Sequence, residues 1–486
     1  MADHVNRTDP VKLSARERLQ QLFDPGTFLE MFRYAKERPA QNPVDDGVVC
    51  GHGDVNGQPV IAYATEFSVQ GGSLGALQTR QIAECQRFAH QSGIPIVALL
   101  ESGGARISEA VHIMEGFVPA MTGGIELSGV VPQIACVFGP CIGASAFMAT
   151  FSDWVIMETE SSLSIAGARV NAMATGENLS DRELGGVTVH THDTGNVHFV
   201  EQGDQAVLER ARELLQWLPP HYKARPAVRP FSALPVSEQQ RKTPEIARCI
   251  PADSQTGFDM RKVVQACADH QHFFETQADF APNLLTGFIE LGGYTLAVVA
   301  SQPLHLGGVL DVKATRKMTR FLTFIAAFNY PLLSLVDVPG ALPTLASQRA
   351  GILTHMTQAM HAIYNVRSLK ITVVVRRCFG GTYSMLHPKS SKGDLVFAYP
   401  GAMIGVMSDA AMHQIMQHSE KGQRQIQKLE SLGLRTDAPQ LAAAAMYIDD
   451  IIDPEDTRQV LYRSLKSFYH KRRIGYPDKL QGNPPR

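Results

Sequence analysis

The sequence predicts an α/β protein built from two tandem domains that descend from an internal duplication. Short apolar runs typical of buried strands alternate with helix-like segments, as in α/β crossover units. Three blocks of the first half recur in the same order, with matched residues such as Gly71 and Gly307, or Ile134 and Ile371, about 236 or 237 residues apart. The length of 486 residues also exceeds what a single hydrophobic core usually serves, so two domains are expected.

The recurring blocks give the order of the expected elements. They pair residues 63–77 with 298–312, 94–107 with 330–343, and 131–148 with 368–385. In each half a strand leads into a glycine-rich turn, a helix follows, and the next apolar strand begins. Helical periodicity predicts helices at 76–93 and 315–329, directly before the apolar runs IPIVALL and YPLLSLV.

The two domains are expected to meet at residues 218–245. This segment is rich in proline and shows little periodicity, which is typical of a linker. We therefore place an N-terminal domain at residues 1–225 and a C-terminal domain at residues 226–486.

Composition excludes several classes of protein. The formal net charge is -2 and 44% of the residues are hydrophobic, values that are ordinary for a soluble globular protein. No basic stripe is interleaved with aromatic residues, and the one basic cluster, Lys471–Arg473, is interpreted as a solvated tail. No uncharged apolar run reaches membrane-spanning length, and no targeting peptide is evident. Neither nucleic acid nor a membrane is therefore expected as a partner.

The cysteines indicate a reducing compartment. There are seven of them, dispersed along the chain and without a CxxC pair. This pattern favours reduced thiols and a cytoplasmic location over disulfides or a zinc site. Cys136 and Cys141 stand in or beside an apolar run and are expected to be buried structural thiols. No HExxH or phosphate-loop motif occurs, and no metal is expected in this chain.

Two glycine turns that follow apolar strands are the strongest candidates for chemistry. The first, Gly143-Ala144, opens a helical run, and its counterpart spans Gly380–Thr382. A helix N-terminus presents unpaired N–H groups, so such a turn can stabilise an oxygen that becomes negative during a reaction. Two related turns suggest two polarised carbonyl groups. The alternative is that the glycines only allow strand and helix to pack closely.

The stretch LLESGGARISEAV raises a related question. Gly103 and Gly104 stand where a strand gives way to a helix-like segment, which indicates a close approach to the backbone. Arg106 either contacts an anionic group or pairs with Glu109, three residues on. Ser102 is not expected to be a nucleophile, because no GxSxG elbow surrounds it and no partner can be assigned. Three histidines near glycine turns are interpreted as structural: His305, His355 and His387.

With these blocks assembled, the chain resembles the carboxyltransferase (β) subunits of biotin-dependent acyl-CoA carboxylases, of the propionyl-CoA and methylcrotonyl-CoA type. The likeness covers nearly the whole chain, and the matching motifs include KLSARERLQQLFDPGTFLE, SGGARI, ELGGVTVHTHDTGNVH, QPLHLGGVLD, VDVPG and YIDDIIDPEDTR. The resemblance implies two crotonase-like domains, each a β-β-α superhelix. It also implies a homo-hexamer, a trimer of dimers, with active sites where the N-domain of one subunit meets the C-domain of another.

The resemblance implies the chemistry as well. Acyl-CoA enters along the N-domain and carboxybiotin along the C-domain. The biotin anion left after release of CO2 removes the α-proton of the thioester, and the enolate attacks CO2, so the protein supplies backbone donors rather than a side-chain base. No biotinyl-lysine motif is present, so biotin is expected on a separate carrier protein, with a biotin carboxylase as a further partner. The acyl group is expected on CoA or on a carrier protein.

Site residues follow from the resemblance position by position. Gly143 and Ala144 match the pair that holds the acyl thioester oxygen, and Gly381 and Thr382 match the pair that holds the biotin ureido oxygen. Ser384 falls where related proteins carry an acid that shapes acyl specificity. The other substrate-binding residues implied are Gly72, Gly103, Gly104, Ala105 and Arg106, and the cofactor-binding residues are Gln302, Gly307 and Gly308.

Several positions depart from the family pattern, many of them on the biotin side. They are Ala144, Arg169, Ser301, Ala341, Ala350, Thr382 and Ser384. The departures are compatible with an unusual acyl substrate, an altered acceptor or the loss of biotin chemistry. Two alternatives to a carboxyltransferase component therefore stay open. One is an acyl-CoA decarboxylase or transcarboxylase with the same fold, and the other is a non-catalytic subunit of a hetero-oligomeric carboxylase.

Overall fold

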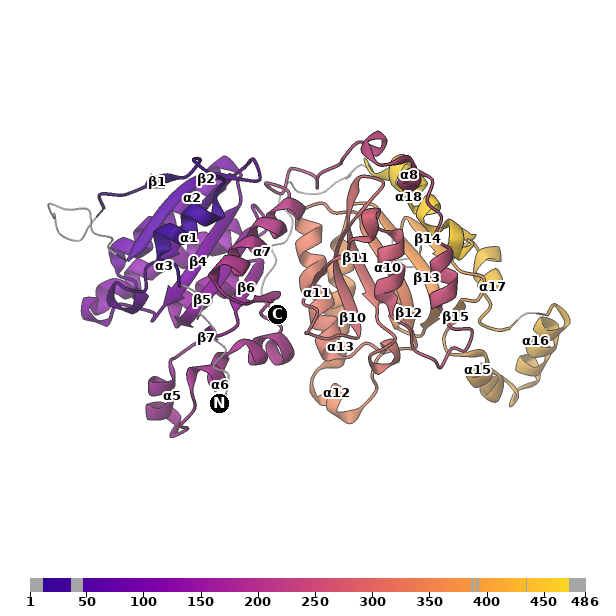
Figure 1. Ribbon diagram of the computed structural model, residues 1–486. Helices are drawn as coiled ribbons and strands as arrows, with labels where there is room; N and C mark the ends of the chain where they lie inside the picture. Colours follow the sequence, from indigo (N-terminus) through magenta and orange to yellow (C-terminus); the bar gives the residue numbers. More distant parts are fainter. Residues whose placement is uncertain (1–11, 36–46, 386–388, 390–392, 434, 472–486) are drawn as a thin grey trace, which may run out of the picture. The chain divides into compact units, whose positions relative to one another are not determined.

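Each half of the chain folds around its own β-sheet (Figure 1). The computed structural model describes residues 12–35, 47–385, 389, 393–433 and 435–471. The described residues form two compact units, the first ending at Ala224 and the second beginning at Arg225. Within those residues, each unit contains an eight-stranded sheet.

The sheet of the first unit joins an antiparallel edge to a parallel body. Its order is β1 (Leu29–Met31), β2 (Val48–Val55), β3 (Gln58–Thr65), β4 (Ile96–Ser102), β5 (Gln133–Ile142), β6 (Trp154–Glu158) and β8 (Phe199–Glu201), with β7 (Ser162–Ser164) beside β5. The pairs β1–β2 and β2–β3 are antiparallel, and the pairs from β3 onward are parallel. Asn56 and Gly57 join β2 to β3 with positive φ at both residues, which suits the twist of a two-residue hairpin.

Helices cover both faces of this sheet. α1 (Ala15–Leu22) and α7 (Asp204–Trp217) pack on one face, and α2 (Ala76–Ser92), α3 (Val111–Leu127) and α4 (Ala144–Phe151) pack on the other. Two shorter α-helices, α5 (Ala168–Thr175) and α6 (Asp181–Gly185), follow β7. The prediction of a helix at 76–93 is confirmed by α2, which ends at Gly93 in the left-handed conformation.

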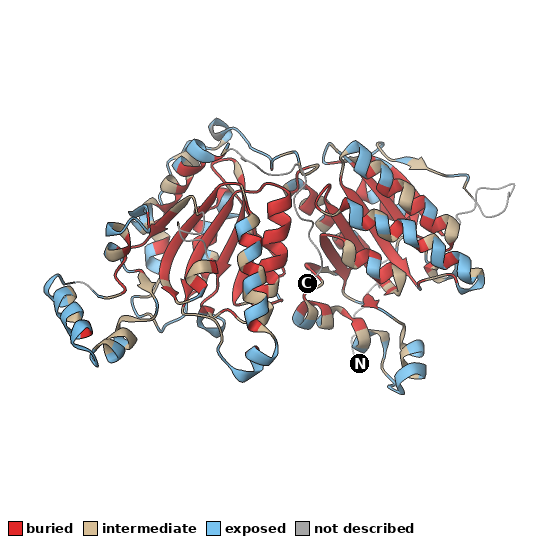
Figure 2. Ribbon diagram, turned by 180° about the vertical axis from the view of Figure 1, so that it is seen from behind, coloured by how far each residue is buried: buried red, intermediate tan, exposed pale blue. Residues whose placement is uncertain are grey.

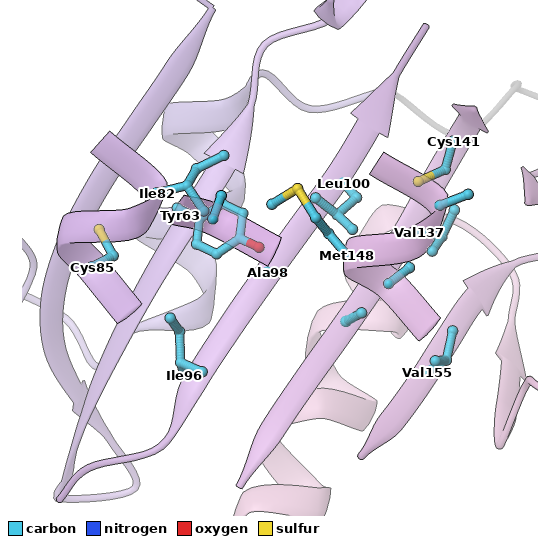
Figure 3. Packing of buried hydrophobic residues seen from close by; sticks show 14 of the residues in the cluster. Tyr63, Ile82, Cys85, Ile96, Ala98, Leu100, Val137, Cys141, Met148 and Val155 are labelled. Carbon is cyan, nitrogen blue, oxygen red and sulfur yellow. The ribbon is translucent and has the colours of Figure 1, made fainter. Parts of the chain in front are cut away.

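The core of the first unit lies between its sheet and helices α2, α3 and α4 (Figure 3). Side chains alternate along β4, so Ile96, Ala98 and Leu100 all face these helices. The strands are buried along most of their length, while the helices expose their outer faces (Figure 2). Cys136 and Cys141 are fully buried, as predicted, and this burial raises the pKa of both thiols. All seven cysteines of the chain are free thiols.

The second unit repeats this architecture. Its sheet order is β9 (Phe274–Thr276), β10 (Leu284–Leu291), β11 (Tyr294–Ser301), β12 (Leu332–Val338), β13 (Lys370–Phe379), β14 (Leu395–Ala398) and β16 (Asp450–Ile451), with β15 (Met403–Gly405) beside β13. α10 (Met260–Cys267) and α18 (Thr457–Phe468) pack on one face, and α11 (Val312–Ala327) and α13 (Ile352–Asn365) pack together on the other. The prediction of a helix at 315–329 is confirmed by α11, which starts earlier because the Asp311 side chain caps it.

Shorter elements complete the second unit and the turns of both sheets. The remaining α-helices of the second unit are α8 (Val236–Gln239), α9 (Pro244–Cys249), α12 (Leu345–Arg349), α14 (Thr382–Met385), α15 (Asp409–Met416), α16 (Glu420–Ser431) and α17 (Pro439–Ala444). The 3-10 helices η1 (Gln70–Gly72) and η6 (Leu306–Gly308) occupy matching turns, after β3 and after β11.

The strand registers agree with an internal duplication. β3 and β4 pair as β11 and β12 do, at a separation of 236 residues. The separation grows to 237 residues for the next strand, because Ile96 pairs with Gln133 whereas Leu332 pairs with Lys370. The turn that follows β5 therefore corresponds to the turn that follows β13.

The segment at 218–245 differs from the predicted linker. It contains α8, and its backbone bonds to the second unit. The Arg229 N–H donates to the Gly293 carbonyl at 2.8 Å, and the Thr243 N–H donates to the Glu455 carbonyl at 2.8 Å. Proline interrupts the periodicity of this segment, but its backbone groups still find partners. From Arg225 onward the segment is part of the second unit rather than a free linker.

A buried acid interrupts the same strand pair in each unit. The register of β4 with β5 shifts at Glu101, and the register of β12 with β13 shifts at Asp337. Arg18 of α1 bonds Glu101 at 2.8 Å, whereas Asp337 is bonded by Arg376 at 2.8 Å and by Arg377 at 2.7 Å. A carboxylate this deeply buried requires such partners. The two units meet the same requirement with arginines from different elements.

Gly72 is expected to be much less tolerant of alanine than its neighbour Gly71. Both have a positive φ, 65° at Gly72 and 66° at Gly71, so alanine at either position would carry a similar backbone strain. A Cβ on Gly72 would lie 2.1 Å from the Glu101 carbonyl oxygen, whereas a Cβ on Gly71 meets nothing within 4 Å. We expect Gly72→Ala to lower the free energy of unfolding by about 1–3 kcal/mol more than Gly71→Ala, measured by urea denaturation. Equal losses would contradict this account of the turn.

Candidate active site

The first turn of α4 carries two unused backbone donors. Gly143, between β5 and α4, has a φ of 62°, a conformation that suits glycine. Its N–H donates to the Ser164 carbonyl at the end of β7, at 2.9 Å. In the described part of the chain, the next two N–H groups, those of Ala144 and Ser145, have no acceptor. Because they lie at a helix N-terminus, they can bind a polarised or anionic oxygen.

Two buried hydroxyls connect this turn to the loop after β4. The Ser145 hydroxyl donates to Ser102 Oγ at 2.8 Å, and Ser102 Oγ also accepts from the Gly104 N–H at 3.1 Å. No histidine or acid bonds to either serine among the described residues. Ser102 therefore links this turn to the loop after β4, and the expectation that it is not a nucleophile stays a prediction. The role of Ser145 was missed from sequence, because its partner is 43 residues away.

The close approach expected at Gly103 and Gly104 is made by the chain itself. The Gly103 N–H donates to a carbonyl of η1 at 2.9 Å. A Cβ on Gly104, where φ is 96°, would lie 2.9 Å from the Ile142 carbonyl oxygen. Ala105 forms a bridge with Leu74, next to η1. These contacts bring the predicted substrate-binding residues 72 and 103–106 together in one loop cluster.

Arg106 is paired within the protein. Its side chain is buried, with Nη2 donating to the Ser73 carbonyl at 3.2 Å and Nη1 lying 3.8 Å from Glu109 Oε1. Glu109 also accepts from the Ala76 N–H, at the start of α2, at 2.7 Å. Of the two interpretations of Arg106, the structure shows the ion pair with Glu109, which fixes the loop to the N-terminus of α2.

The second unit carries the equivalent turn. Gly380 has a φ of 64° and donates its N–H to the Gly405 carbonyl of β15 at 3.0 Å. The N–H groups of Gly381 and Thr382 have no acceptor among the residues that the structure describes. The Thr382 hydroxyl is buried and donates to the Phe379 carbonyl at 2.6 Å, so it is turned back towards its own strand.

This correspondence bears on one predicted assignment. Gly143 matches Gly380, because each donates its N–H to the short strand beside the turn. The donors that match the Gly381-Thr382 pair are therefore Ala144 and Ser145. The Gly143 N–H is engaged by Ser164, so the two N–H groups left open at this turn are those of Ala144 and Ser145. Which residues hold the thioester oxygen stays a prediction.

The predicted cofactor-binding residues of the second unit also take part in packing. The buried Gln302 side chain donates to Asp259 at 2.6 Å, near the start of α10. Gly307 and Gly308 lie in η6, and a Cβ on Gly308 would lie 2.6 Å from the Asp337 carbonyl oxygen. These contacts account for Gln302 and Gly308, whereas a Cβ on Gly307, where φ is 60°, would meet nothing within 4 Å. Ligand contact by the three residues stays a prediction.

The departures from the family pattern have local roles. Ser301 Oγ accepts from the Asp337 N–H at 2.7 Å, and Ala341 bridges Leu310 as Ala105 bridges Leu74 in the first unit. Ser384 is half-buried in α14, and Arg169 is exposed.

Three histidines and a basic cluster were also singled out in the sequence. His305 is exposed, His355 bonds Gln358 at 3.0 Å, and His387 lies outside the described residues. Lys471 pairs with Asp394 at 2.6 Å, and the rest of its basic cluster is outside the described residues. In the described ranges no group of three His, Cys, Asp or Glu side chains is arranged to hold a metal ion. No described helix is both long and apolar enough to cross a membrane.

Comparison with known proteins gives the two turns their context. The family model of the carboxyl transferase domain matches residues 8–484. The propionyl-CoA carboxylase beta chain of Roseobacter denitrificans is 34% identical, over 98% of this chain and 94% of its own. The methylmalonyl-CoA carboxyltransferase 12S subunit of Propionibacterium freudenreichii subsp. shermanii is 35% identical, over 98% of this chain and 92% of its own.

The fold comparison agrees. The crystal structure of transcarboxylase 12S, a hexamer with methylmalonyl-CoA and methylmalonic acid bound, matches with a TM-score of 0.89 at 34% identity. The match covers 98% of this chain and 93% of that one, so it includes both units. The predicted pair of tandem α/β domains is confirmed. The chain belongs to the carboxyl transferase domain family and is a carboxyltransferase.

Proposed function

We propose that this chain is the carboxyltransferase component of a biotin-dependent acyl-CoA carboxylase. It transfers CO2 from carboxybiotin, held by a separate carrier protein, to the α-carbon of an acyl thioester. The observation that carries the proposal is the pair of equivalent turns, each with two unused N–H donors at the start of a helix. The relatives are named for propionyl-CoA and methylmalonyl-CoA, which supports a CoA thioester as the substrate.

In the first unit, Ala144 and Ser145 are proposed to bind the thioester carbonyl oxygen. When the α-proton leaves, negative charge moves onto that oxygen, and the two N–H groups and the α4 dipole stabilise the substrate enolate. One such donor contributes roughly 3–4 kcal/mol to a transition state. The bonds from Gly143 to Ser164 and from Ser145 to Ser102 hold the donors in position before the substrate binds.

In the second unit, Gly381 and Thr382 are proposed to bind the ureido oxygen of biotin. These two residues fit a ureido oxygen, because their N–H groups lack acceptors among the described residues. The Thr382 hydroxyl is already bonded to the Phe379 carbonyl. A Cβ on Gly381 would meet only Met356 Cε, at 3.9 Å, so the approach to the turn is open on that side. Biotin, when bound, supplies the CO2 and the base that takes the α-proton.

The proposal extends to the other predicted residues and partners. The loop cluster of residues 72 and 103–106 is assigned to the CoA side, and Gln302, Gly307 and Gly308 to the biotin side, with Ser384 shaping acyl specificity. A biotin carboxylase and a biotin carrier protein are the expected partners. The likeness to the hexameric 12S structure supports a homo-hexamer, and the free thiols suit a cytoplasmic location.

The proposal is tested with the purified chain, a carrier protein bearing labelled carboxybiotin, and a panel of acyl-CoAs. We expect transfer of the label to an acyl-CoA. Release of CO2 from a malonyl-type thioester without the carrier would instead indicate a decarboxylase. Neither activity, together with stable binding to another carboxyltransferase subunit, would overturn the proposal and indicate a non-catalytic subunit.

A further inference from the structure

A cavity of about 150 Å³ lies beside the first turn of α4. One wall is formed by Ala146, Phe147 and Thr150 of α4, and the facing wall includes Leu163 of β7 and Ile165, which follows it. None of the residues that line the cavity is Asp, Glu, Lys or Arg.

The cavity leads away from the proposed thioester donors. Residues 146, 147 and 150 share a helix face with Gly143, since residues three or four apart are neighbours on a helix. The hydrogen bond from Gly143 to Ser164 joins the same turn to the facing wall. Thr150 lies six residues beyond Ala144, about 9 Å along the axis at 1.5 Å per residue. The cavity therefore runs from the donor end of α4 towards Thr150.

His190 is the titratable residue of the lining, and its contacts fit a neutral ring. Its Nε2 lies 2.7 Å from the Leu163 carbonyl, which can only accept, so Nε2 carries a proton. Its Nδ1 lies 3.0 Å from the Thr194 hydroxyl and can accept from it. Burial lowers the pKa of His190. The walls thus present an uncharged, mainly apolar surface.

We propose that this cavity holds the acyl chain of the thioester and that Thr150 limits the length of chain it accepts. This inference rests on the proposed function, because it takes the thioester oxygen to lie at Ala144 and Ser145. A mainly apolar cavity of this volume is large enough for a six-carbon ring such as benzene. The substrate class is therefore an unbranched or branched apolar acyl group of about four to six carbons, rather than acetyl.

Equilibrium binding separates this inference from the proposed function, because it does not depend on turnover. Acetyl-, butyryl-, hexanoyl- and octanoyl-CoA are titrated into the purified full chain by calorimetry. Affinity is expected to rise from acetyl- to hexanoyl-CoA. Thr150→Leu should weaken the binding of hexanoyl-CoA relative to that of acetyl-CoA by on the order of tenfold, because methylene groups that no longer fit in the cavity are no longer buried. Thr150→Ala should shift the preference towards octanoyl-CoA.

Thr175→Leu is the matched control. Thr175 is also helical and its hydroxyl also bonds a carbonyl of its own helix, but it is exposed on α5. The Thr175→Leu variant should show the same preference for acyl chain length as the unmodified chain. Affinity that does not change with chain length, or a Thr150→Leu profile equal to that of Thr175→Leu, would overturn the inference and leave the proposed function standing. Failure of every CoA thioester to bind would contradict the proposed function itself.

Discussion

Replacing Ala144 with proline is expected to lower kcat for carboxyl transfer by about 10²–10³-fold. Proline removes the Ala144 N–H, one of the two donors proposed for the thioester oxygen. Ala144 is the first residue of α4, the helical position at which proline is best tolerated. Gly143 has no Cβ, which relieves much of the crowding that a following proline imposes. The fold should therefore survive while the donor is lost.

Ala144→Gly is the control for this variant, since it keeps the N–H. Its kcat should stay close to that of the unmodified chain. Steady-state kinetics measure both variants, and circular dichroism checks that α4 and the rest of the fold are retained. A folded Ala144→Pro enzyme with unchanged kcat would refute the role of this N–H group.

Replacing Arg18 with methionine is expected to lower the free energy of unfolding by about 3–5 kcal/mol. Arg18 is buried and bonds two buried carboxylates, Glu101 at 2.8 Å and Asp204 at 2.7 Å. It also lies over the Phe138 ring, 4.2 Å from the centroid. Methionine keeps much of the apolar stem but leaves both acids without this partner. Chemical denaturation, followed by fluorescence, measures the loss.

Arg182→Met is the matched control for the loss of an ion pair. Arg182 bonds Glu160 at 2.8 Å, but the two side chains are 68% and 69% exposed. Water solvates both groups when the pair is broken, so stability should hardly change. If the two variants lost the same free energy of unfolding, the contribution of Arg18 to stability would not depend on the burial of its ion pairs.

The sequence predicted the local elements well because their determinants are local. The helix at α2 is marked by its own periodicity and by Gly93 directly after it, and both signals lie within the segment. The repeated blocks extended this prediction to the second unit. The resemblance to the carboxyltransferase family then pointed to the turns after β5 and β13, which the structure shows to be equivalent.

The remaining details depend on contacts between distant residues. Nothing near Ser145 in the sequence indicates that its hydroxyl meets Ser102, or that Gly143 donates to Ser164. The donor pair that we propose from the structure is therefore shifted by one residue from the predicted pair. The basic partners of Glu101, Lys12 and Arg18, were missed for the same reason, because even Arg18 lies 83 residues before it.

The buried acids Glu101 and Asp337 have a consequence for how the two halves can evolve. In the first half the counter-charge comes from a helix that precedes the sheet, and in the second half from the strand that follows the acid. A recombinant that joined the front of the second half to the back of the first would inherit Asp337 but neither arginine source. The reciprocal hybrid would gather an excess of positive charge around Glu101. An exchange of segments between the two halves at this position would therefore leave the buried acid with too few or too many basic partners.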